Sequence, residues 1–465
     1  VSSVVHIGCG AGFSGDRVDA AIPVVATLAK KEGPKYLIFE TLAERTLALA
    51  QKHRRKDPSH GYSPFLESYI RPILKKCHES GIKIVSNFGA ANPKGGAIKI
   101  AEIAKETGCN DIKIAIVEGD DLLQIMSGAD IQNHPTIEGL DIGDNEVLAA
   151  NAYLGARPIA EALQKGADVV VVGRCTDPAL VLGPLIKEFS WAENDWSKLA
   201  AGTMAGHLLE CGGQVTGAYF ADPGYKDVPN LANVGFPLAE VKSDGTLIIT
   251  KAENTGGLVS AQTVKEQLLY EIHDPENYYT ADVILDISKV EVTEVGLDRV
   301  EVSGANGKPR PDTLKATVSI DGGWMGEAEM SYAGPNALKR ARLAIDILKS
   351  RYRDIGTNYP IRFDILGTMS VHSGDNEDIT SSHSYPEDGD YRIRVATCGH
   401  EKEVIERINQ EVLSLYCSGP AAGGGFRQHL TDQVQTASIL VDREKIRPKV
   451  ISAIKKAKRP KIISS

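Results

Sequence analysis

The chain has 465 residues, of which 42% are hydrophobic and 24% charged, and its formal net charge is −9. This length exceeds one ordinary compact core, so we expect two or three structural units, and the composition is typical of a globular protein. The acidic balance argues against a nucleic-acid-binding surface, which normally carries a basic excess.

The cysteines and the apolar segments indicate the compartment. Seven cysteines are scattered without a CxxC pair. Such an odd, sparse set fits a reducing compartment better than a secreted disulfide framework. The beginning of the chain lacks a basic region followed by a long apolar stretch, and no window approaches about 18 consecutive apolar residues. We therefore expect a soluble, cytoplasmic protein with no membrane partner.

Short apolar runs alternate with stretches of helical spacing in the first half of the chain. The predicted strands are Val4–Ile7, Tyr36–Phe39, Ile82–Val85, Ile112–Val117 and Asp168–Val172. The predicted helices between them include Thr41–Lys52, Ser63–Ser80, Ala97–Thr107 and Pro158–Lys165. This alternation predicts an α/β fold with a mainly parallel sheet covered by helices.

The second half changes character along the chain. Helical spacing continues over Trp196–Cys211 and Ser260–Ile272, and alternating stretches then predict antiparallel strands at Lys289–Val292, Arg299–Val302 and Leu314–Ile320. The last part predicts strands at Ile361–Ile365 and Tyr391–Ala396 and helices at Glu401–Tyr416 and Asp442–Lys456. We expect a parallel α/β domain over residues 1–280, a strand-rich extension over 281–352 and a smaller C-terminal α+β unit over 353–465.

The ends of the five parallel strands predict the site, because ligands of open parallel sheets bind outside the carboxyl ends of the strands. The polar and glycine residues that follow these strands are the predicted substrate-binding residues Gly10, Gly12, Ser14, Gly15, Glu40, Asn87, Asn92, Glu118 and Asp120. Each of these residue types also forms ordinary turns, so a single loop decides little. The five loops together predict a polar crevice.

Four charged residues at the first and fifth strand ends are candidate catalytic residues. Asp16 and Arg17 follow the first strand, and Arg174 and Asp177 follow the fifth. The two arginines would hold a carboxylate or phosphate in forked hydrogen bonds. An acidic side chain or His207 would then move the proton.

The glycine-rich start also allows a dinucleotide-binding interpretation. Gly10, Gly12 and Gly15 have the GxGxxG spacing after a strand, and Glu40 ends the next strand, where a ribose-binding acid would stand. Two features oppose this interpretation. Asp16 stands where helix amides would receive a pyrophosphate, and Pro23 predicts a helix that starts only near that residue.

Two further segments are candidates. On the predicted helix Trp196–Cys211, the side chains of His207, Glu210 and Cys211 share one face, which suits a general base steadied by an acid or part of a metal site. A lone histidine among apolar residues is more often structural. The loop that contains Thr255, Gly256 and Gly257 precedes a helix and could bind an anion through its amides, although a plain helix cap explains it equally well.

Several long strings of the chain resemble a known family. They read GAGFSGDR, IFETLAE, GDDLL, GRCTDPALVLGPL, AGTMAGHLLECGGQVTG and NTGGLVSAQTVKEQLLYEI. In this order they resemble the acyclic terpene utilisation (AtuA-type) family from Gly10 to about Ile272, and more loosely through the antiparallel region. The loop after the third strand often reads NAGGVNP in that family, whereas here it reads NFGAANP, which would alter the shape of a substrate pocket.

The resemblance implies breakdown of branched acyclic terpenes, in a setting of branched acyl-CoA thioesters. It favours a lyase, hydratase or hydrolase that acts on a small anionic substrate, such as a branched carboxylate or a CoA thioester. We expect that no metal or cofactor is required, and that the enzyme is a homo-oligomer. An NAD(P)-dependent oxidoreductase and a non-catalytic subunit of a catabolic complex remain the alternatives.

Overall fold

The computed structural model describes residues 4–452 apart from 144, 357, 369 and 374–383. The chain divides into one compact unit of residues 1–319 and 436–465 and a second unit of residues 320–435. It passes between them inside two long strands, β14 (Thr313–Gly334) and β17 (Gly424–Asp442). The division therefore falls at residues 319/320 and 435/436, whereas the sequence places boundaries near 280 and 352. An unbroken strand carries no composition change that could mark a boundary.

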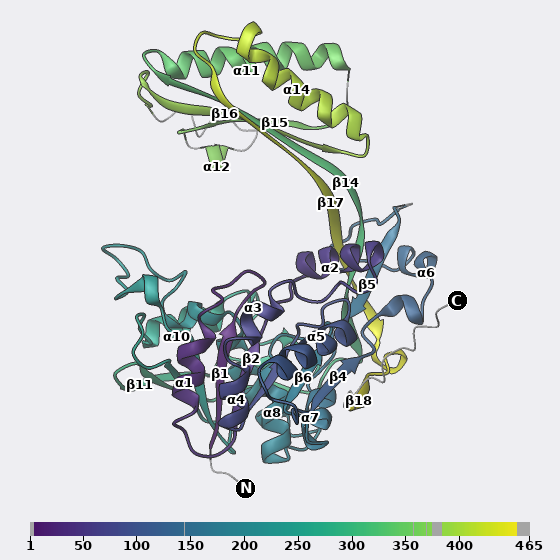
Figure 1. The fold of residues 1–465 in the computed structure, drawn as a ribbon, viewed down its shortest axis with the longest axis vertical. Helices are drawn as coiled ribbons and strands as arrows, with labels where there is room; N and C mark the ends of the chain where they lie inside the picture. Colours follow the sequence, from purple (N-terminus) through teal and green to yellow (C-terminus); the bar gives the residue numbers. More distant parts are fainter. Residues whose placement is uncertain (1–3, 144, 357, 369, 374–383, 453–465) are drawn as a thin grey trace. The chain divides into compact units, whose positions relative to one another are not determined.

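The first unit is built on a ten-stranded mixed sheet with the order β11-β12-β8-β7-β1-β2-β3-β6-β4-β18. Several of these strands, among them β1, β2, β6 and β4, are labelled in Figure 1. Its parallel centre consists of β1 (Val4–Ala11), β2 (Lys35–Phe39), β3 (Ile82–Ser86), β6 (Val169–Val172) and β4 (Ile114–Glu118). Antiparallel strands flank it: β7 (Pro237–Lys242), β8 (Leu247–Lys251), β12 (Arg299–Ser303) and β11 (Glu291–Gly296) on one side and β18 (Lys449–Ser452) on the other.

The predicted mixed α/β class is confirmed, and each of the five predicted parallel strands is present. The expectation of a mainly parallel sheet goes too far, because the antiparallel strands on both flanks make the sheet evenly mixed. Buried strands such as Val169–Val172, with four valines, are apolar on both faces and are easily recognised. The flanking strands alternate in polarity, so the sequence shows that they are strands but not which sheet they join.

Helices cover both faces of this sheet. Those that pack in the core on one face are α1 (Ala21–Leu28), α3 (Leu66–Ile70), α4 (Leu74–Glu79) and α5 (Pro93–Glu106). The helices α7 (Arg157–Gln164), α8 (Ala179–Phe189) and α9 (Trp196–Glu210) contact the sheet strands as well. Alternate strand residues such as Ile84 and Ile116 belong to the first core, so their neighbours face the other side.

Further elements complete the first unit. They are the helices α2 (Glu44–Lys56), α6 (Gly128–Gln132) and α10 (Ala261–Leu269), the 3₁₀ turns η1 (Leu122–Gln124), η2 (Gly212–Thr216), η3 (Leu231–Asn233) and η4 (Arg443–Lys445), and the small sheet β13 (Asn306–Lys308), β10 (Ile284–Asp286) and β9 (Tyr278–Tyr279). Strand β5 (Val147–Ala152) pairs with β14.

Two predicted helices differ from the structure, and a proline explains each. The predicted helix Ser63–Ser80 is divided into α3 and α4, because Pro72 lies between them. The predicted final helix Asp442–Lys456 is wrong over its described part. That part holds η4 and the strand β18, which pairs antiparallel with β4, and Pro448 stands between the two. Residues 453–456 lie outside the described residues.

The second unit is a sheet with the order β15 (Ile361–Leu366), β16 (Gly389–Gly399), β14 and β17. Helices α11 (Ala337–Ile355) and α14 (Lys402–Ser418) pack on one face of it, and α12 (Ser370–Ser373) is short (Figure 1). Its core joins alternate strand residues such as Met330 and Ile393 to helix residues such as Leu348 and Val412. This unit thus has a hydrophobic core of its own.

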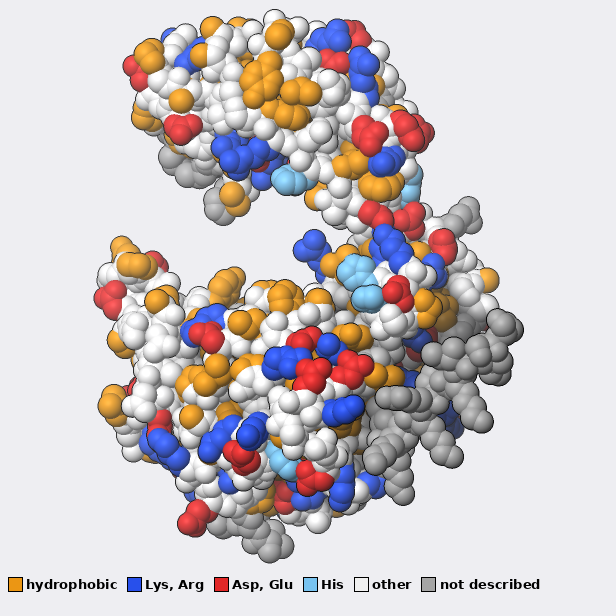
Figure 2. Space-filling model, in the orientation of Figure 1, with side chains coloured by type: hydrophobic (Ala, Val, Ile, Leu, Met, Phe, Trp, Pro, Cys, Tyr) orange, Lys and Arg blue, Asp and Glu red, His pale blue; other side chains and the backbone are white. Residues whose placement is uncertain are grey.

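No helix in the described part of the chain has the length and apolar character needed to cross a bilayer. On the face shown in Figure 2, basic and acidic side chains of the first unit lie interspersed.

Gly12 allows the loop after β1 to lie very close to the residues that follow α9. A Cβ atom on Gly12 would lie 2.3 Å from the Cys211 carbonyl carbon and 2.4 Å from the Gly212 nitrogen. These are backbone atoms, which cannot rotate away. The loop after β1 therefore rests directly on the end of α9.

We predict that Gly12→Ala lowers the stability of the protein by about 1–3 kcal/mol, because the added methyl group overpacks two backbone segments. Gly128→Ala is the matched control, since its Cβ would meet only Val147 Cβ at 4.0 Å. Thermal unfolding measures both variants. Equal midpoints for the two variants would contradict the predicted close approach.

Candidate active site

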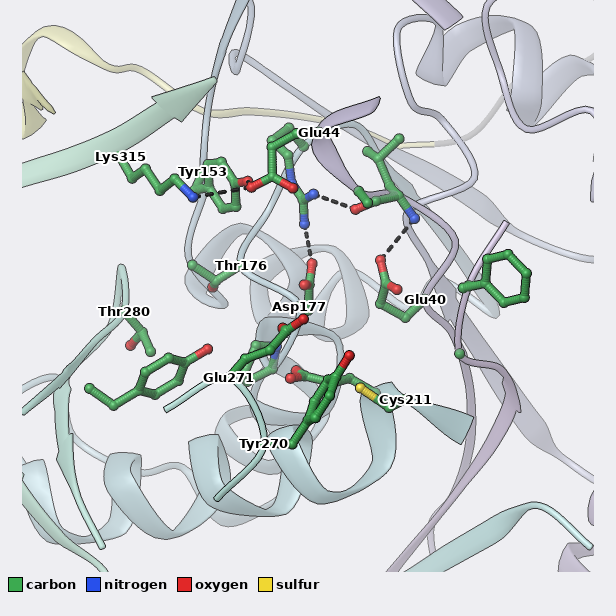
Figure 3. Close-up of a pocket in the computed structure, with 18 of the residues that line it drawn as sticks. Glu40, Glu44, Tyr153, Thr176, Asp177, Cys211, Tyr270, Glu271, Thr280 and Lys315 are labelled. Atoms are coloured by element: carbon green, nitrogen blue, oxygen red, sulfur yellow. Dashed lines mark hydrogen bonds and ion pairs between the residues drawn. The ribbon is translucent and has the colours of Figure 1, made fainter. Parts of the chain in front are cut away.

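A cavity of about 1040 Å³ opens at the carboxyl ends of the parallel strands (Figure 3). All of its lining residues belong to the first unit. The charged ones are Asp16, Arg17, Glu40, Glu44, Arg174, Asp177, Glu210, Glu271 and Lys315. Acidic side chains therefore outnumber basic ones around the cavity.

The loop after β1 folds back on its own carboxylate. Asp16 Oδ2 accepts a hydrogen bond of 2.8 Å from Gly12 N, and Oδ1 accepts one of 2.8 Å from Arg17 N. Burial raises the pKa of Asp16, and these amide bonds oppose the rise. The Arg17 side chain donates to Asp19 and to the Val234 carbonyl oxygen. The amide that a pyrophosphate would need is thus already bound to a carboxylate.

Glu40 directly follows β2 and is buried, with an exposed fraction of 8%. Its Oε1 accepts hydrogen bonds of 2.8 Å from Leu42 N and of 2.8 Å from Asn87 Nδ2. No described residue hydrogen-bonds Oε2. Burial, and next the charge of Asp177, raise the pKa of Glu40 to about 8. This carboxyl group is therefore mostly neutral at pH 7.

Arg174, at the end of β6, is 1% exposed, and the protein's own acceptors surround its guanidinium. It donates to the carbonyl oxygens of Leu42 and Cys175 and to the Asp177 carboxylate. Its Cζ lies 4.3 Å from the centre of the Tyr153 ring. The donors of this guanidinium are therefore engaged with acceptors of the protein itself, whereas the sequence predicts a forked contact with the substrate.

Asp177 faces the cavity with a side chain that is 36% exposed. Desolvation in the cavity raises its pKa, and the ion pair with Arg174 opposes the rise. Behind it, Asp120 Oδ2 accepts from Arg174 N at 3.0 Å and from Asn151 Nδ2 at 2.8 Å. Burial raises the pKa of Asp120 to about 6. Asp120 thus supports the Arg174 backbone and does not line the cavity.

The cavity is also lined by a second ionic group, formed around Glu44, which the sequence does not predict. Tyr153 donates a hydrogen bond of 2.5 Å to Glu44 Oε1, and Lys315 Nζ lies 3.1 Å from the same oxygen (Figure 3). Burial alone would raise the pKa of Glu44, but these two donors outweigh it and hold the pKa at about 2. Tyr153 follows β5 and Lys315 lies in β14, so only the pairing of these distant strands brings them together.

The predicted group of His207, Glu210 and Cys211 is present at the end of α9, but the acid and not the histidine reaches the cavity. His207 is buried and does not line the cavity, whereas Glu210 and Cys211 do. His207 Nδ1 and Glu210 Oε1 lie 2.9 Å apart. Burial raises the pKa values of the Cys9, Cys175 and Cys211 thiols, so these cysteines remain protonated.

The structure brings only part of the predicted site together. Gly12, Asp16, Arg17, Glu40, Arg174 and Asp177 line the cavity, and Asn87 and Asp120 hold lining groups from behind. The predicted residues that do not line it are Gly10, Ser14, Gly15, Asn92, Glu118, His207, Thr255, Gly256 and Gly257. The sequence analysis missed the lining residues Tyr270, Tyr278 and Thr280, at the end of α10 and in and after β9. Tyr270 lies in the family-like string NTGGLVSAQTVKEQLLYEI, whereas no motif covers Tyr278 and Thr280; Tyr270 and Thr280 are labelled in Figure 3.

Two of the outlying segments have a structural role. Asn92 caps α5, because its side chain accepts from Gly95 N at 2.9 Å. The amides of Gly256 and Gly257 donate to the carbonyl oxygens of Asn233 and Pro229 at 2.7 and 2.8 Å. These amides are therefore occupied and form no open anion site. Among the described residues, no group of three or more His, Cys, Asp and Glu side chains is placed to hold a metal ion.

The comparison with known proteins agrees with the motifs. The model of the family described as "Acyclic terpene utilisation family protein AtuA" matches residues 5–452. The chain belongs to this family. No curated protein and no solved structure matches it. The AtuA match spans both units, so the second unit belongs to the family's sequence pattern as much as the cavity does.

We predict that Glu40→Gln flattens the pH dependence of stability in this AtuA protein. The pKa of Glu40 is about 8 in the folded state and 4.5 ordinarily, so between these values the unfolded state binds fewer protons. Unfolding free energy should then fall with rising pH, by on the order of 1 kcal/mol per pH unit. Glutamine keeps the Oε1 acceptor and cannot ionise. Denaturant unfolding at pH 5, 6, 7 and 8 measures the difference, with Glu161→Gln as control, and parallel curves would refute it.

We also predict that Arg174→Ala destabilises the protein by about 3 kcal/mol, because it leaves Asp177 and the Leu42 carbonyl group without their donor. Arg174→Lys should recover only part of the loss, since an ammonium group cannot reach all the acceptors of the fork. The control Arg71→Ala, at an exposed ion pair, should change the unfolding midpoint much less. A stable Arg174→Ala protein would show that the guanidinium does not hold the site together.

Proposed function

We propose that the cavity is the active site of an acid–base enzyme, a lyase, hydratase or hydrolase that acts on a branched carboxylic acid in the form of its CoA thioester. The observation that carries this proposal is Glu40, a buried carboxyl group that faces a large cavity and has a pKa of about 8. A neutral carboxyl group at pH 7 can donate a proton to a carbonyl or leaving hydroxyl oxygen.

A proton acceptor stands in the same cavity. The charge of Asp177 interacts with Glu40 and is a main cause of its raised pKa after burial. Burial raises the pKa of Asp177 and the ion pair with Arg174 opposes this rise. The Asp177 side chain is also 36% exposed, whereas Glu40 is 8% exposed, so the ionised form is favoured at Asp177. Two interacting carboxyl groups in different environments are the arrangement that divides acid and base roles. Glu40 is then the acid and Asp177 the base.

The remaining lining of the cavity supports a branched hydrocarbon substrate. Leu42, Val234, Phe236, Ile137 and Leu440 give it apolar walls, and its volume of about 1040 Å³ accepts a ligand larger than a short acid. Family membership points the same way, since the AtuA family is associated with acyclic terpenes.

At the acyl end of the substrate, the charges of the cavity favour the neutral carbonyl group of a thioester over a free carboxylate. The three basic side chains among its lining residues are each engaged, Arg17 with Asp19, Arg174 with Asp177 and Lys315 with Glu44. A free carboxylate would meet surplus acidic groups without an open guanidinium, whereas the carbonyl group of a thioester accepts a proton or hydrogen bond from neutral Glu40. The occupied amide of Gly12 argues against a dinucleotide at this place.

The first test is ligand binding. Thermal unfolding against branched acyl-CoA thioesters, the matching free acids, NAD and NADP should show stabilisation by a thioester alone. A ligand at about one hundred times its dissociation constant adds about 2.7 kcal/mol. Stabilisation by NAD or NADP alone would replace the proposal with an oxidoreductase, and turnover of no bound thioester would favour a non-catalytic subunit.

For a thioester that is turned over, we predict that kcat/KM falls as pH rises through about 8, because the reaction needs protonated Glu40. Glu40→Gln should lower kcat by about 10²–10⁴-fold while the protein stays folded and binds the thioester. The exposed variant Glu161→Gln serves as control. A Glu40→Gln enzyme with an unchanged rate and pH profile would remove Glu40 from the mechanism.

A further inference from the structure

The end of α9 holds a buried pair of ionisable side chains beside the cavity. His207 and Glu210 have side-chain exposures of 1% and 9%, and they stand three residues apart on one face of the helix. His207 Nδ1 and Glu210 Oε1 are 2.9 Å apart. The imidazole ring therefore occupies one oxygen of the carboxyl group from behind.

The second oxygen of this carboxyl group has no partner. Glu210 Oε2 is buried, and no described residue forms a hydrogen bond with it, although Glu210 lines the cavity. Buried carboxylate oxygens are normally satisfied, and one that is not marks a place for a donor from outside the chain. A solvent-facing carboxylate such as Glu271, exposed at the same cavity, carries no such signal.

His207 and Glu210 shift each other's pKa values. Burial opposes protonation of His207, but the hydrogen bond between Nδ1 and the Glu210 carboxyl group outweighs it and raises the pKa of the ring. Burial raises the pKa of Glu210, and the ring opposes this rise. Because the ring contacts only Oε1, Oε2 remains available to accept a hydrogen bond. Gln267 Nε2 donates to the His207 carbonyl oxygen at 3.0 Å, and the Tyr278 ring lies 5.6 Å from the imidazole ring.

We infer that Glu210 Oε2 accepts a hydrogen bond from a hydroxyl group of the substrate, so that the substrate class is a hydroxylated branched acyl thioester. This inference rests on the proposed function and names its substrate more closely. A hydroxyl group fits better than an ammonium group, because a cation bound at the buried Oε2 atom would lose its hydration. The hydroxyl group would lie in the same cavity as Glu40 and Asp177.

Two matched probes test this inference. They are the pantetheine thioesters of 3-hydroxy-3-methylbutanoic acid and of 3-methylbutanoic acid, which differ by one hydroxyl group, and calorimetry gives both dissociation constants. The native protein should bind the hydroxylated probe at least tenfold more tightly, because a site built for a hydroxyl group rejects the analogue without it.

Glu210→Met removes the acceptor at nearly constant volume, and it should abolish the preference while the affinity for the deoxy probe changes by less than about threefold. Glu161→Met, on the exposed face of α7, is the control and should retain the preference. A merely structural Glu210 would lower both affinities together and keep their ratio.

The outcomes separate this inference from the proposed function. If the native protein binds both probes equally, or if Glu210→Met keeps the preference, the inference is overturned while thioester binding stands. If the native protein binds neither probe, both the inference and the proposed function for these thioesters are overturned. The comparison of the two probes on native protein decides the inference even where Glu210→Met does not fold.

Discussion

The buried charge of Arg174 is the constraint on which the site depends. A guanidinium that is 1% exposed needs acceptors around it, because an unpaired buried charge is costly. Its acceptors come from the loops after β2 and β6, and Tyr153, after β5, stacks on it. The guanidinium therefore links the segments that follow β2, β5 and β6. The same arrangement positions Glu40, since the Leu42 carbonyl oxygen accepts from Arg174 and the Leu42 amide donates to the Glu40 carboxyl group.

Within this frame, surroundings rather than residue type decide which carboxyl groups hold protons. Glu40 and Glu44 stand four residues apart and line one cavity, yet their pKa values are about 8 and about 2. Burial acts on both. Glu44 is compensated by the Tyr153 hydroxyl group and Lys315. Glu40 has neutral hydrogen-bond donors, and burial and the charge of Asp177 raise its pKa by more than the charge of Arg174 lowers it. The number and charge of the neighbouring donors thus decide whether a buried carboxyl group in this cavity keeps its proton.

The parts of the structure that could be predicted are those encoded by neighbouring residues. Apolar runs such as Val169–Val172 identify the parallel strands, and the polar residues after them identify the edge with the cavity. Lys315 could not be found in this way, because it reaches Glu44 only through the pairing of β14 with β5. Nor could residue types show that Arg174 and the amide of Gly257 are already engaged inside the protein.

Helical periodicity places His207 and Glu210 on one face of α9, but it cannot show which of them reaches the cavity, since this helix is buried nearly all round. Gly206 lets the helix approach Pro178, where a Cβ would lie 2.5 Å from Pro178 Cα, and His207 is enclosed. Glu210 then stands in the last helical turn, where the negative end of the helix dipole disfavours a carboxylate. A buried acid at an unfavourable helix end, with one oxygen unpartnered, weakens the fold. Arrangements that lower stability in this way are common at functional sites, where a ligand supplies the missing hydrogen-bond partner.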